Sequence, residues 1–229
     1  MDWLICSGIW VGGCAVALLL AASRSMGGDP SWPLVAVTGL GTVAIYGFDR
    51  WAIDRAGPPF WILPLLPAAV LGLRLPVAAI PILVGVCGLA LVHARLRELP
   101  WTKPLYITVA WIGVVIGVPW VLRGGGSVPL ALAPLTLAIV ANVLACDAVD
   151  REAEAAQIDP HRVWWLARIL ALTGVVVALM SPGAEAIAAV PAMLVLALIP
   201  WPVSRRWVER GLDGALMAGA LLASLITGG

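Results

Sequence analysis

Nine apolar segments, each close to the length of a bilayer crossing, follow one another along this chain. A helix of about 20 apolar residues crosses a bilayer, and the short stretches between these segments hold the Gly, Pro and charged residues that end helices. The pattern therefore predicts an all-α polytopic membrane bundle of about nine transmembrane helices, forming a single domain over residues 1–229. The segments cover approximately 3–22, 32–48, 59–75, 76–93, 105–122, 129–146, 163–181, 185–201 and 212–228.

Composition supports this interpretation. The chain is 62% hydrophobic and 12% charged, whereas soluble domains are about 45–50% apolar and roughly 25% charged. The excess of apolar surface is expected to face lipid, which makes the bilayer the first predicted partner. A net charge of +1 and the lack of a polybasic tail argue against nucleic acid as a partner. Arg greatly outnumbers Lys, which favours a bacterial source and hence the inner membrane.

Basic residues test the count of nine and give an orientation. If the N-terminus lies in the cytoplasm, nine alternating segments place ten basic residues in cytoplasmic loops and three outside, as the positive-inside rule requires. The outer residues are Arg24, Arg74 and Arg123. The ten cytoplasmic residues are Arg50, Arg55, Arg95, Arg97, Lys103, Arg151, Arg162, Arg205, Arg206 and Arg210. Most acidic residues fall on the same side, which indicates a polar site at the cytoplasmic face.

The densest group of acids follows the sixth segment. Asp147, Asp150 and Glu154 are spaced i, i+3, i+7, so on an α-helix they share one face. Like charges on one face repel, and each costs free energy near hydrocarbon. A divalent cation removes both problems, and Mg²⁺ prefers carboxylate oxygens while sharing itself with substrate phosphates. The spacing therefore indicates a magnesium site.

A second acidic group ends the second segment, with Asp49 and Asp54 in the stretch "YGFDRWAIDRAG". Four segments separate the two groups, so both helices would reach the cytoplasm in the same direction. This arrangement is typical of a parallel internal repeat, here about 32–122 and 129–228. Asp49 and Asp54 are five residues apart and do not share a face on a straight helix. Solvated residues at helix ends remain an alternative interpretation of both groups.

The acidic stretches after segments two and six resemble those of the UbiA superfamily of intramembrane prenyltransferases. The similarity extends to "LRELPWTKPLYITVAW" (96–111), to "NVLACDAVDREAE" (142–154) and, loosely, to "ERGLDGALM" (209–217). Family members commonly carry Asn-Asp-x-x-Asp-x-x-x-Asp in the first motif. Here Ile45 and Tyr46 stand where its leading Asn-Asp would be, and the last Asp is displaced by one residue. The second motif keeps its acid spacing, with Glu154 as the final acid.

The resemblance implies an isoprenyl diphosphate substrate, Mg²⁺ and ionisation of the allylic C–O bond, with Asp49 and Asp150 as catalytic residues. Two sets of site residues follow from it. The implied magnesium ligands are Asp49, Asp54, Asp147, Asp150 and Glu154. The implied diphosphate contacts are Arg50, Arg55, Arg95, Arg97 and Lys103, whose alternative role is to orient the chain in the membrane.

Aromatic and amide side chains near these motifs are candidates for lining the pocket. They are Tyr46, Trp51, Tyr106, Trp111 and Asn142. Asn142 lies within the sixth segment, where its amide needs a partner, either a carboxylate, a water or a neighbouring helix. Nine other tryptophans lie near segment ends and are expected to form an interfacial belt. They are Trp3, Trp32, Trp61, Trp101, Trp120, Trp164, Trp165, Trp201 and Trp207. Asp159 and Pro160 are expected to open the seventh helix as its N-cap and first turn.

The function expected from these patterns is Mg²⁺-dependent transfer of an isoprenyl group to an acceptor, an aromatic ring or a lipid, in isoprenoid biosynthesis. Two alternatives remain open. One is a membrane terpene cyclase, which ionises the same diphosphate without an acceptor. The other is a non-catalytic protein that binds a lipid or an ion. The active site is expected on the cytoplasmic side.

Overall fold

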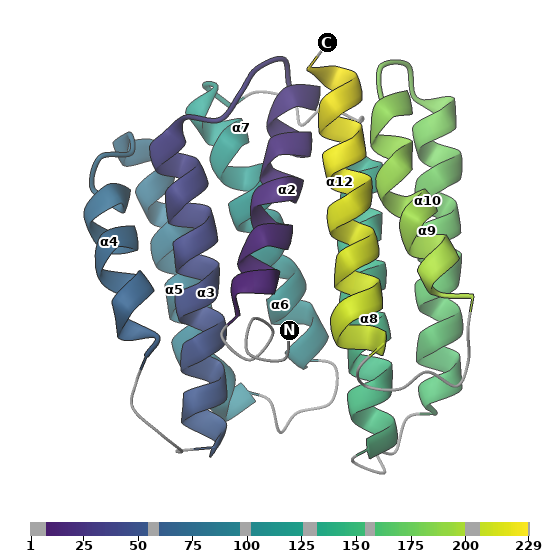
Figure 1. The fold of residues 1–229 in the computed structure, drawn as a ribbon, viewed down its shortest axis with the longest axis horizontal. Helices are drawn as coiled ribbons and strands as arrows, with labels where there is room; N and C mark the ends of the chain where they lie inside the picture. The colour runs from purple at the N-terminus through teal and green to yellow at the C-terminus, as the bar shows by residue number, and fades with distance from the viewer. Residues whose placement is uncertain are drawn as a thin grey trace. The chain divides into compact units, whose positions relative to one another are not determined.

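A computed structural model describes residues 8–54, 60–96, 102–125, 132–153, 159–199 and 207–228. Within these ranges the side chains at 50, 52–54, 93–96, 103, 150–153 and 209 are excluded. The described residues form helices and no strands (Figure 1). In chain order they are α2 (Ile9–Ser25), α3 (Trp32–Asp54), α4 (Ile62–Gly72), η1 (Val77–Ala79), α5 (Ile80–Leu96), α6 (Thr102–Ile112), η2 (Gly113–Gly117), α7 (Val118–Leu122), α8 (Ala133–Ala153), α9 (Pro160–Met180), η4 (Glu185–Ala188), α10 (Ala189–Ala197), η5 (Val208–Leu212) and α12 (Asp213–Thr227).

The all-helical prediction is confirmed for the described part of the chain, and each of the nine apolar segments contains helix. Three helical stretches there are long and apolar enough to cross a membrane: Pro104–Leu122, Pro160–Met180 and Arg210–Thr227. Crossing by all nine segments stays a prediction. The tight break expected near Arg74–Pro76 is present, because α4 ends at Gly72 and α5 follows a single 3₁₀ turn.

The exposed face of α9 is apolar, as expected of a helix that borders lipid. Its exposed side chains include Leu166, Ile169, Leu172, Val176 and Leu179, which recur at helical spacing. Five large apolar groups on one face would be costly in water, since burying each is worth about 1.5–3 kcal/mol. The bilayer removes this cost, so α9 has the outer face that a membrane span requires.

The chain divides into two compact units. Unit 1 comprises Met1–Leu19 and Asp29–Gly126, and unit 2 comprises Leu20–Gly28 and Ser127–Gly229. The division between Gly126 and Ser127 falls between residues 122 and 129, where the sequence predicts the boundary of the internal repeat. The repeat and the single-domain organisation both stay predictions.

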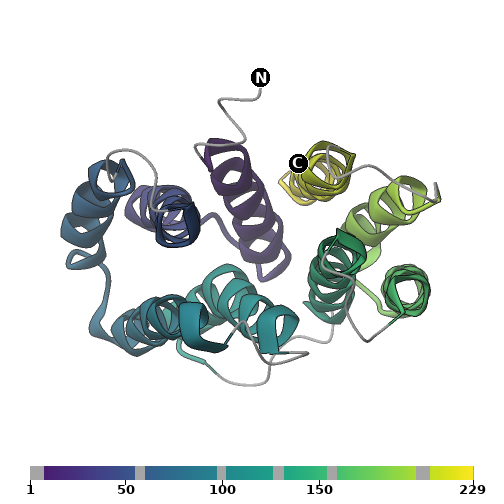
Figure 2. The same cartoon turned by 90° about the horizontal axis from the view of Figure 1, so that it is seen from below.

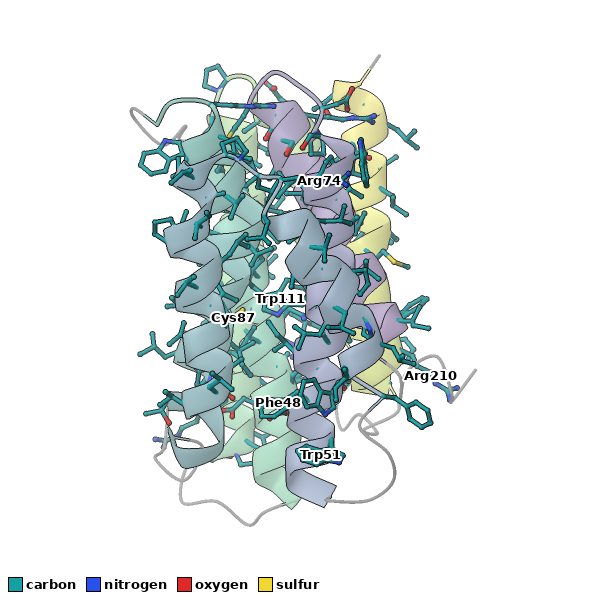
Figure 3. All side chains as sticks on the ribbon, turned by 90° about the vertical axis from the view of Figure 1, so that its left-hand side faces the viewer. Phe48, Trp51, Arg74, Cys87, Trp111 and Arg210 are labelled. Atoms are coloured by element: carbon teal, nitrogen blue, oxygen red, sulfur yellow. The ribbon has the colours of Figure 1, made fainter. Side chains whose placement is uncertain are left out.

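Unit 1 is held together by apolar packing and by an aromatic cluster of Phe48, Trp51 and Trp61. Its buried core includes Leu19, Leu34, Val37, Leu75, Ala79 and Val118. Phe48 and Trp51 lie on the C-terminal part of α3 (Figure 3), and Trp61 precedes α4. The ring centroids of Phe48 and Trp61 are 5.1 Å apart in an edge-to-face arrangement, and those of Trp51 and Trp61 are 6.1 Å apart. These contacts fasten α3 to α4 at this end.

Unit 2 is built on close packing of α10 against α8, α9 and α12, seen nearly end-on in Figure 2. Small residues permit the approach. A Cβ atom on Gly219 of α12 would lie 2.7 Å from both the Ala189 carbonyl oxygen and the Val190 Cα of α10. A Cβ atom on Gly174 of α9 would lie 3.0 Å from the Cβ of Pro191. Such contacts are typical of helix pairs in membranes, where close backbone packing replaces the hydrophobic driving force.

Side chains from elsewhere in unit 2 satisfy the backbone carbonyls at the end of α10. Trp164 Nε1 donates to the Leu198 oxygen at 3.2 Å, and Trp207 Nε1 donates to the Ala197 oxygen at 3.1 Å. Arg168 donates to the oxygens of Leu198 and Ile199 at 2.8 and 2.6 Å. The last carbonyls of a helix have no partner within it, and a cation there also complements the helix dipole. The positions of Trp164 and Arg168 on α9 are therefore explained by the end of a neighbouring helix.

This arrangement corrects one expectation. Trp164 was predicted to belong to an interfacial belt, but only 1% of it is exposed. The prediction was wrong because nearness to a segment end does not show which face of a helix a residue occupies. The adjacent Trp165 is 58% exposed, and its ring stacks against Arg168, with the guanidinium carbon 4.7 Å from the ring centroid.

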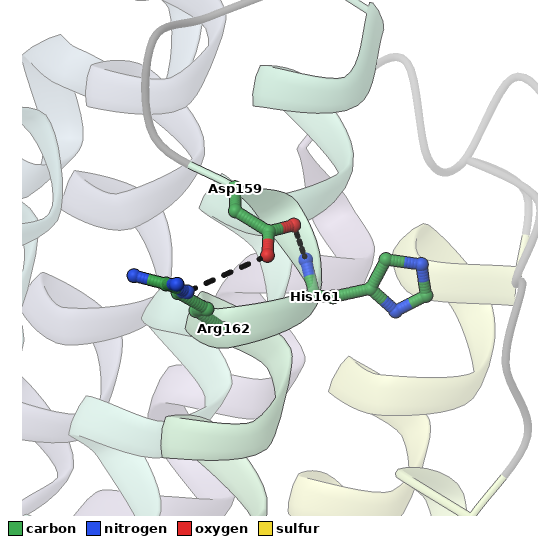
Figure 4. A network of polar contacts seen from close by, with 3 residues as sticks. All are labelled: Asp159, His161 and Arg162. Carbon is green, nitrogen blue, oxygen red and sulfur yellow. Dashed lines mark hydrogen bonds and ion pairs between the residues drawn. The ribbon is translucent and has the colours of Figure 1, made fainter.

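Two further helix ends in unit 2 are satisfied by polar side chains. Asp159 is the N-cap of α9, as predicted: its carboxylate accepts a hydrogen bond from the His161 backbone N–H at 3.0 Å (Figure 4). Arg162 Nε lies 3.7 Å from the same carboxylate. At the other end of unit 2, Arg24 donates to the Ser224 oxygen at 2.7 Å, in the last turn of α12. His161 thus contributes its backbone N–H to the cap.

Replacing Arg168 by Met tests the capping of α10. We expect a lower melting temperature in nanodiscs, because hydrogen bonds from a charged donor contribute about 1.5–3 kcal/mol and the substitution removes those to the Leu198 and Ile199 oxygens. Thr173→Val is the matched control, since Thr173 is exposed on the same helix and bonds only to the Ile169 oxygen of its own helix. Equal melting temperatures of Arg168→Met and the wild type would contradict this role.

Replacing Gly219 by Ala tests the contact between α10 and α12. The added methyl group would overlap backbone atoms that cannot move aside, so we expect a loss of about 1–3 kcal/mol in stability. Gly85→Ala on α5 is the control, because a Cβ there meets nothing within 4 Å. Thermal unfolding followed by circular dichroism gives both values. A Gly219→Ala protein as stable as Gly85→Ala would show that the close approach is unimportant.

Candidate functional site

The acidic stretch after the sixth segment lies on α8, which continues to Ala153, beyond the end predicted from hydropathy. Asp147 and Asp150 are therefore helical and three residues apart, as expected. Asp147 is buried, with 5% of the residue exposed. The side chain of Asp150 and all of Glu154 lie outside the described residues, so a shared face for the three acids stays a prediction.

The C-terminal end of α8 carries acidic residues. Arg168 reaches the end of α10, and Arg24 reaches the end of α12. The end of α8 instead has Asp150 in its last turn and buried Asp147 in the turn before. Carboxylates near the negative end of a helix dipole are unfavourable. Arg151 follows Asp150 in the sequence, and its side chain is outside the described set.

Asn142 connects α8 to the start of α12. It is 6% exposed, and its Nδ2 donates a hydrogen bond to Asp213 Oδ1 at 3.0 Å, a contact between residues 71 positions apart. The expectation that this amide needs a partner is confirmed, and the partner is a carboxylate. The other amide atom, Asn142 Oδ1, is buried and has no hydrogen-bond partner among the described residues.

Asp213 was not among the predicted site residues. It follows the π-helical turn η5 (Val208–Leu212) and opens α12. Single π-helical turns within α-helices are frequent at functional sites. Its acid character was a usable signal, because Asp213 lies inside Arg210–Thr227, which is apolar enough to span a membrane. Ionisable residues inside such segments are rare and mark functional sites by default.

The acids after the second segment lie on α3, in unit 1. Asp49 is partly buried, and Asp54 is the last residue of the helix, with its side chain outside the described set. Among the predicted pocket residues of unit 1, Tyr46 and Trp51 lie on α3, and Tyr106 and Trp111 lie on α6 (Figure 3). Tyr106 is buried and the other three are partly buried. Their membership of one pocket stays a prediction.

The predicted diphosphate contacts are largely beyond what the structure describes. Arg50, Arg95 and Lys103 are placed only by their backbone, in α3, α5 and α6. Arg55 and Arg97 lie outside the described ranges. Their role toward a diphosphate therefore stays a prediction.

The residues near Asp147 are chemically compatible with magnesium. Asp147 offers a buried carboxylate, the ligand type that Mg²⁺ prefers. Among side chains that the structure describes, no group of three or more His, Cys, Asp or Glu is arranged to hold a metal. The side chains of Asp54, Asp150 and Glu154, three of the five predicted ligands, lie outside this described set. The magnesium prediction therefore stands on the α8 acids and is open to direct test.

Comparison of the chain with protein-family models, with curated proteins and with solved structures found no match. The resemblance to the UbiA superfamily therefore rests on the motifs quoted above.

Magnesium binding to the α8 acids predicts a metal-dependent stability. A ligand that binds only the folded state stabilises it by about 2.7 kcal/mol at about 100 times its Kd. We expect Mg²⁺ to raise the melting temperature of the wild type and to have little effect on Asp147→Asn. Glu185→Gln is the control, because this carboxylate is in the same unit but exposed. An equal response to Mg²⁺ in Asp147→Asn and the wild type would exclude Asp147 as a ligand.

Proposed function

We propose that this protein is a magnesium-dependent intramembrane prenyltransferase of the UbiA kind, acting on an isoprenyl diphosphate and an acceptor. The observation that carries the proposal is the burial of Asp147 on α8, at the end of a largely apolar stretch of that helix. A buried carboxylate costs free energy unless it is paired, hydrogen-bonded or bound to a metal. An ionisable residue retained in such a stretch is a candidate for a functional site.

The acids of α8 suit the chemistry of an allylic diphosphate. Diphosphate leaves readily only when its developing negative charge is neutralised, which bound Mg²⁺ supplies. In the proposal Asp147, Asp150 and Glu154 of unit 2 would hold a metal ion, and Asp49 and Asp54 of unit 1 are the second candidate set of ligands. Arg50, Arg55, Arg95, Arg97 and Lys103 bind the diphosphate oxygens, as guanidinium and ammonium groups do elsewhere. The apolar helices exclude water from the cation that forms when the C–O bond breaks.

The proposed location follows from the same features. Three candidate membrane spans and the exposed apolar face of α9 support an integral membrane protein. The distribution of Arg and Lys supports a cytoplasmic N-terminus and a cytoplasmic site, and the preference for Arg supports a bacterial inner membrane. An isoprenyl chain would then enter from the bilayer while its diphosphate stays at the cytoplasmic face.

Turnover by purified protein in nanodiscs tests the proposal. Geranyl, farnesyl and geranylgeranyl diphosphates are supplied with or without Mg²⁺ and with a panel of phenols and lipid alcohols. We expect Mg²⁺-dependent diphosphate release that requires an acceptor and gives a prenylated product. Terpene hydrocarbon or alcohol formed without an acceptor would replace the proposal by a membrane terpene cyclase. No turnover under any condition would favour a lipid- or ion-binding protein.

Asp150→Ala tests the metal assignment within this assay. Loss of a central ligand should lower Mg²⁺-dependent turnover by about 100-fold or more, since one electrostatic contact to a developing charge contributes about 10²–10³ in kcat. Glu185→Gln should keep the wild-type rate. An unchanged rate in Asp150→Ala would remove the α8 acids from the mechanism.

A further inference from the structure

The first half of α9 carries two arginines and an exposed indole on one side of the helix, here called the α9 patch: Arg162, Trp165 and Arg168. Arg162 is the most exposed of them, with 88% of its side chain accessible. Trp165 is 58% exposed, and Arg168 is partly exposed. Trp165 is three residues from each arginine, so on an α-helix the two arginines flank it.

The α9 patch keeps a positive charge. Arg168 donates to the carbonyl oxygens of Leu198 and Ile199, which satisfy its N–H groups but carry no net charge to neutralise it. Arg162 Nε lies 3.7 Å from the Asp159 carboxylate, which also accepts the N-cap hydrogen bond of α9 (Figure 4). Exposed ion pairs of this kind contribute little to stability, so Arg162 can exchange this partner for another anion at low cost.

The exposed apolar face of α9 continues directly from the α9 patch. Its members on the same side of the helix are Leu166, Ile169, Leu172 and Val176. Indole rings favour the level of the lipid head groups, and long basic side chains reach from a membrane helix toward that level. The order along α9 is therefore cationic groups, then an indole, then apolar side chains. A phospholipid presents the matching order of phosphate, glycerol and acyl chains.

We infer that the α9 patch binds the phosphate of an anionic phospholipid, whose acyl chains lie along the exposed apolar face of α9. Guanidinium groups bind phosphate oxygens strongly and with defined geometry. A head group with a net negative charge is preferred over a zwitterionic one, because the ammonium group of the latter would be repelled by the same two arginines. The inference requires that α9 borders lipid, and it is independent of the proposed enzymatic activity.

Native mass spectrometry of the full, delipidated protein in detergent tests the inference. The probes are dioleoylphosphatidylglycerol and dioleoylphosphatidylcholine, which have the same acyl chains and differ in the charge of the head group. We expect the wild type to bind the first phosphatidylglycerol molecule at least about tenfold more tightly than phosphatidylcholine, because each arginine near an anionic head group contributes about fivefold. Equal affinities for the two lipids would overturn the inference.

A variant and a matched control locate the preference. Arg162→Gln should weaken phosphatidylglycerol binding by about fivefold and leave phosphatidylcholine binding unchanged. The high exposure of Arg162 means that the substitution spares the packing of the fold. Arg74→Gln is the control, because it removes the same charge from an exposed arginine in unit 1 and should keep the wild-type preference. Full preference in Arg162→Gln, or an equal loss in Arg74→Gln, would contradict the site.

Competition with sn-glycerol 1-phosphate separates a lipid from a soluble phosphate ligand. This molecule carries the phosphate and glycerol of a phospholipid without its acyl chains. We expect it to leave bound phosphatidylglycerol in place at equal concentration, because it gains nothing from the apolar face of α9. Displacement at equal concentration would show that the arginines bind phosphate alone, and the lipid assignment would be wrong.

Discussion

Backbone carbonyls at the ends of helices must find donors where water is scarce, and this requirement organises unit 2. The end of α10 is satisfied by the indole of Trp164, the guanidinium of Arg168 and the indole of Trp207. These three side chains, which stand in apolar sequence, therefore have a structural role. The donors come from α9 and from the residue before η5, so one short helix end ties three parts of the unit together. These bonds hold the end of α10 in place, and its start packs closely against Gly219 of α12.

Polar residues within the apolar helices of unit 2 are the better guide to function. Asn142, Asp147 and Asp213 lie on α8 or α12, and each is buried or partly buried. They lie on two helices that also pack against α10. In an apolar chain a buried polar group either completes the fold or takes part in chemistry. The proposed metal site is built on the second interpretation of Asp147.

The sequence predicted the helical segments well, because apolar runs bounded by Gly and Pro leave few alternatives. It also predicted the N-cap at Asp159, since capping depends on residues that are adjacent in the chain. It also predicted that Asp147 and Asp150 are helical, because their spacing matches a helical face, and α8 continues as helix to Ala153 although hydropathy falls. It failed on Trp164, because the rotation of a helix about its axis is set by packing that an apolar sequence encodes weakly. The acids of α8 were identified from spacing alone, whereas the pairing of Asn142 with Asp213 joins residues 71 positions apart and no local pattern records it.

The π-helical turn Val208–Leu212 separates two roles of one segment. Just before it, Trp207 holds the end of α10, and just after it, Asp213 meets Asn142 of α8. A π-helical turn holds one more residue than an α-helical turn, so it winds less per residue. If the same residues formed a regular α-helix, the two sides of the turn would be rotated relative to each other, and Trp207 and Asp213 would no longer reach their separate neighbours together. The wider turn thus fits the spacing of these two residues in the chain to the positions of their two partners.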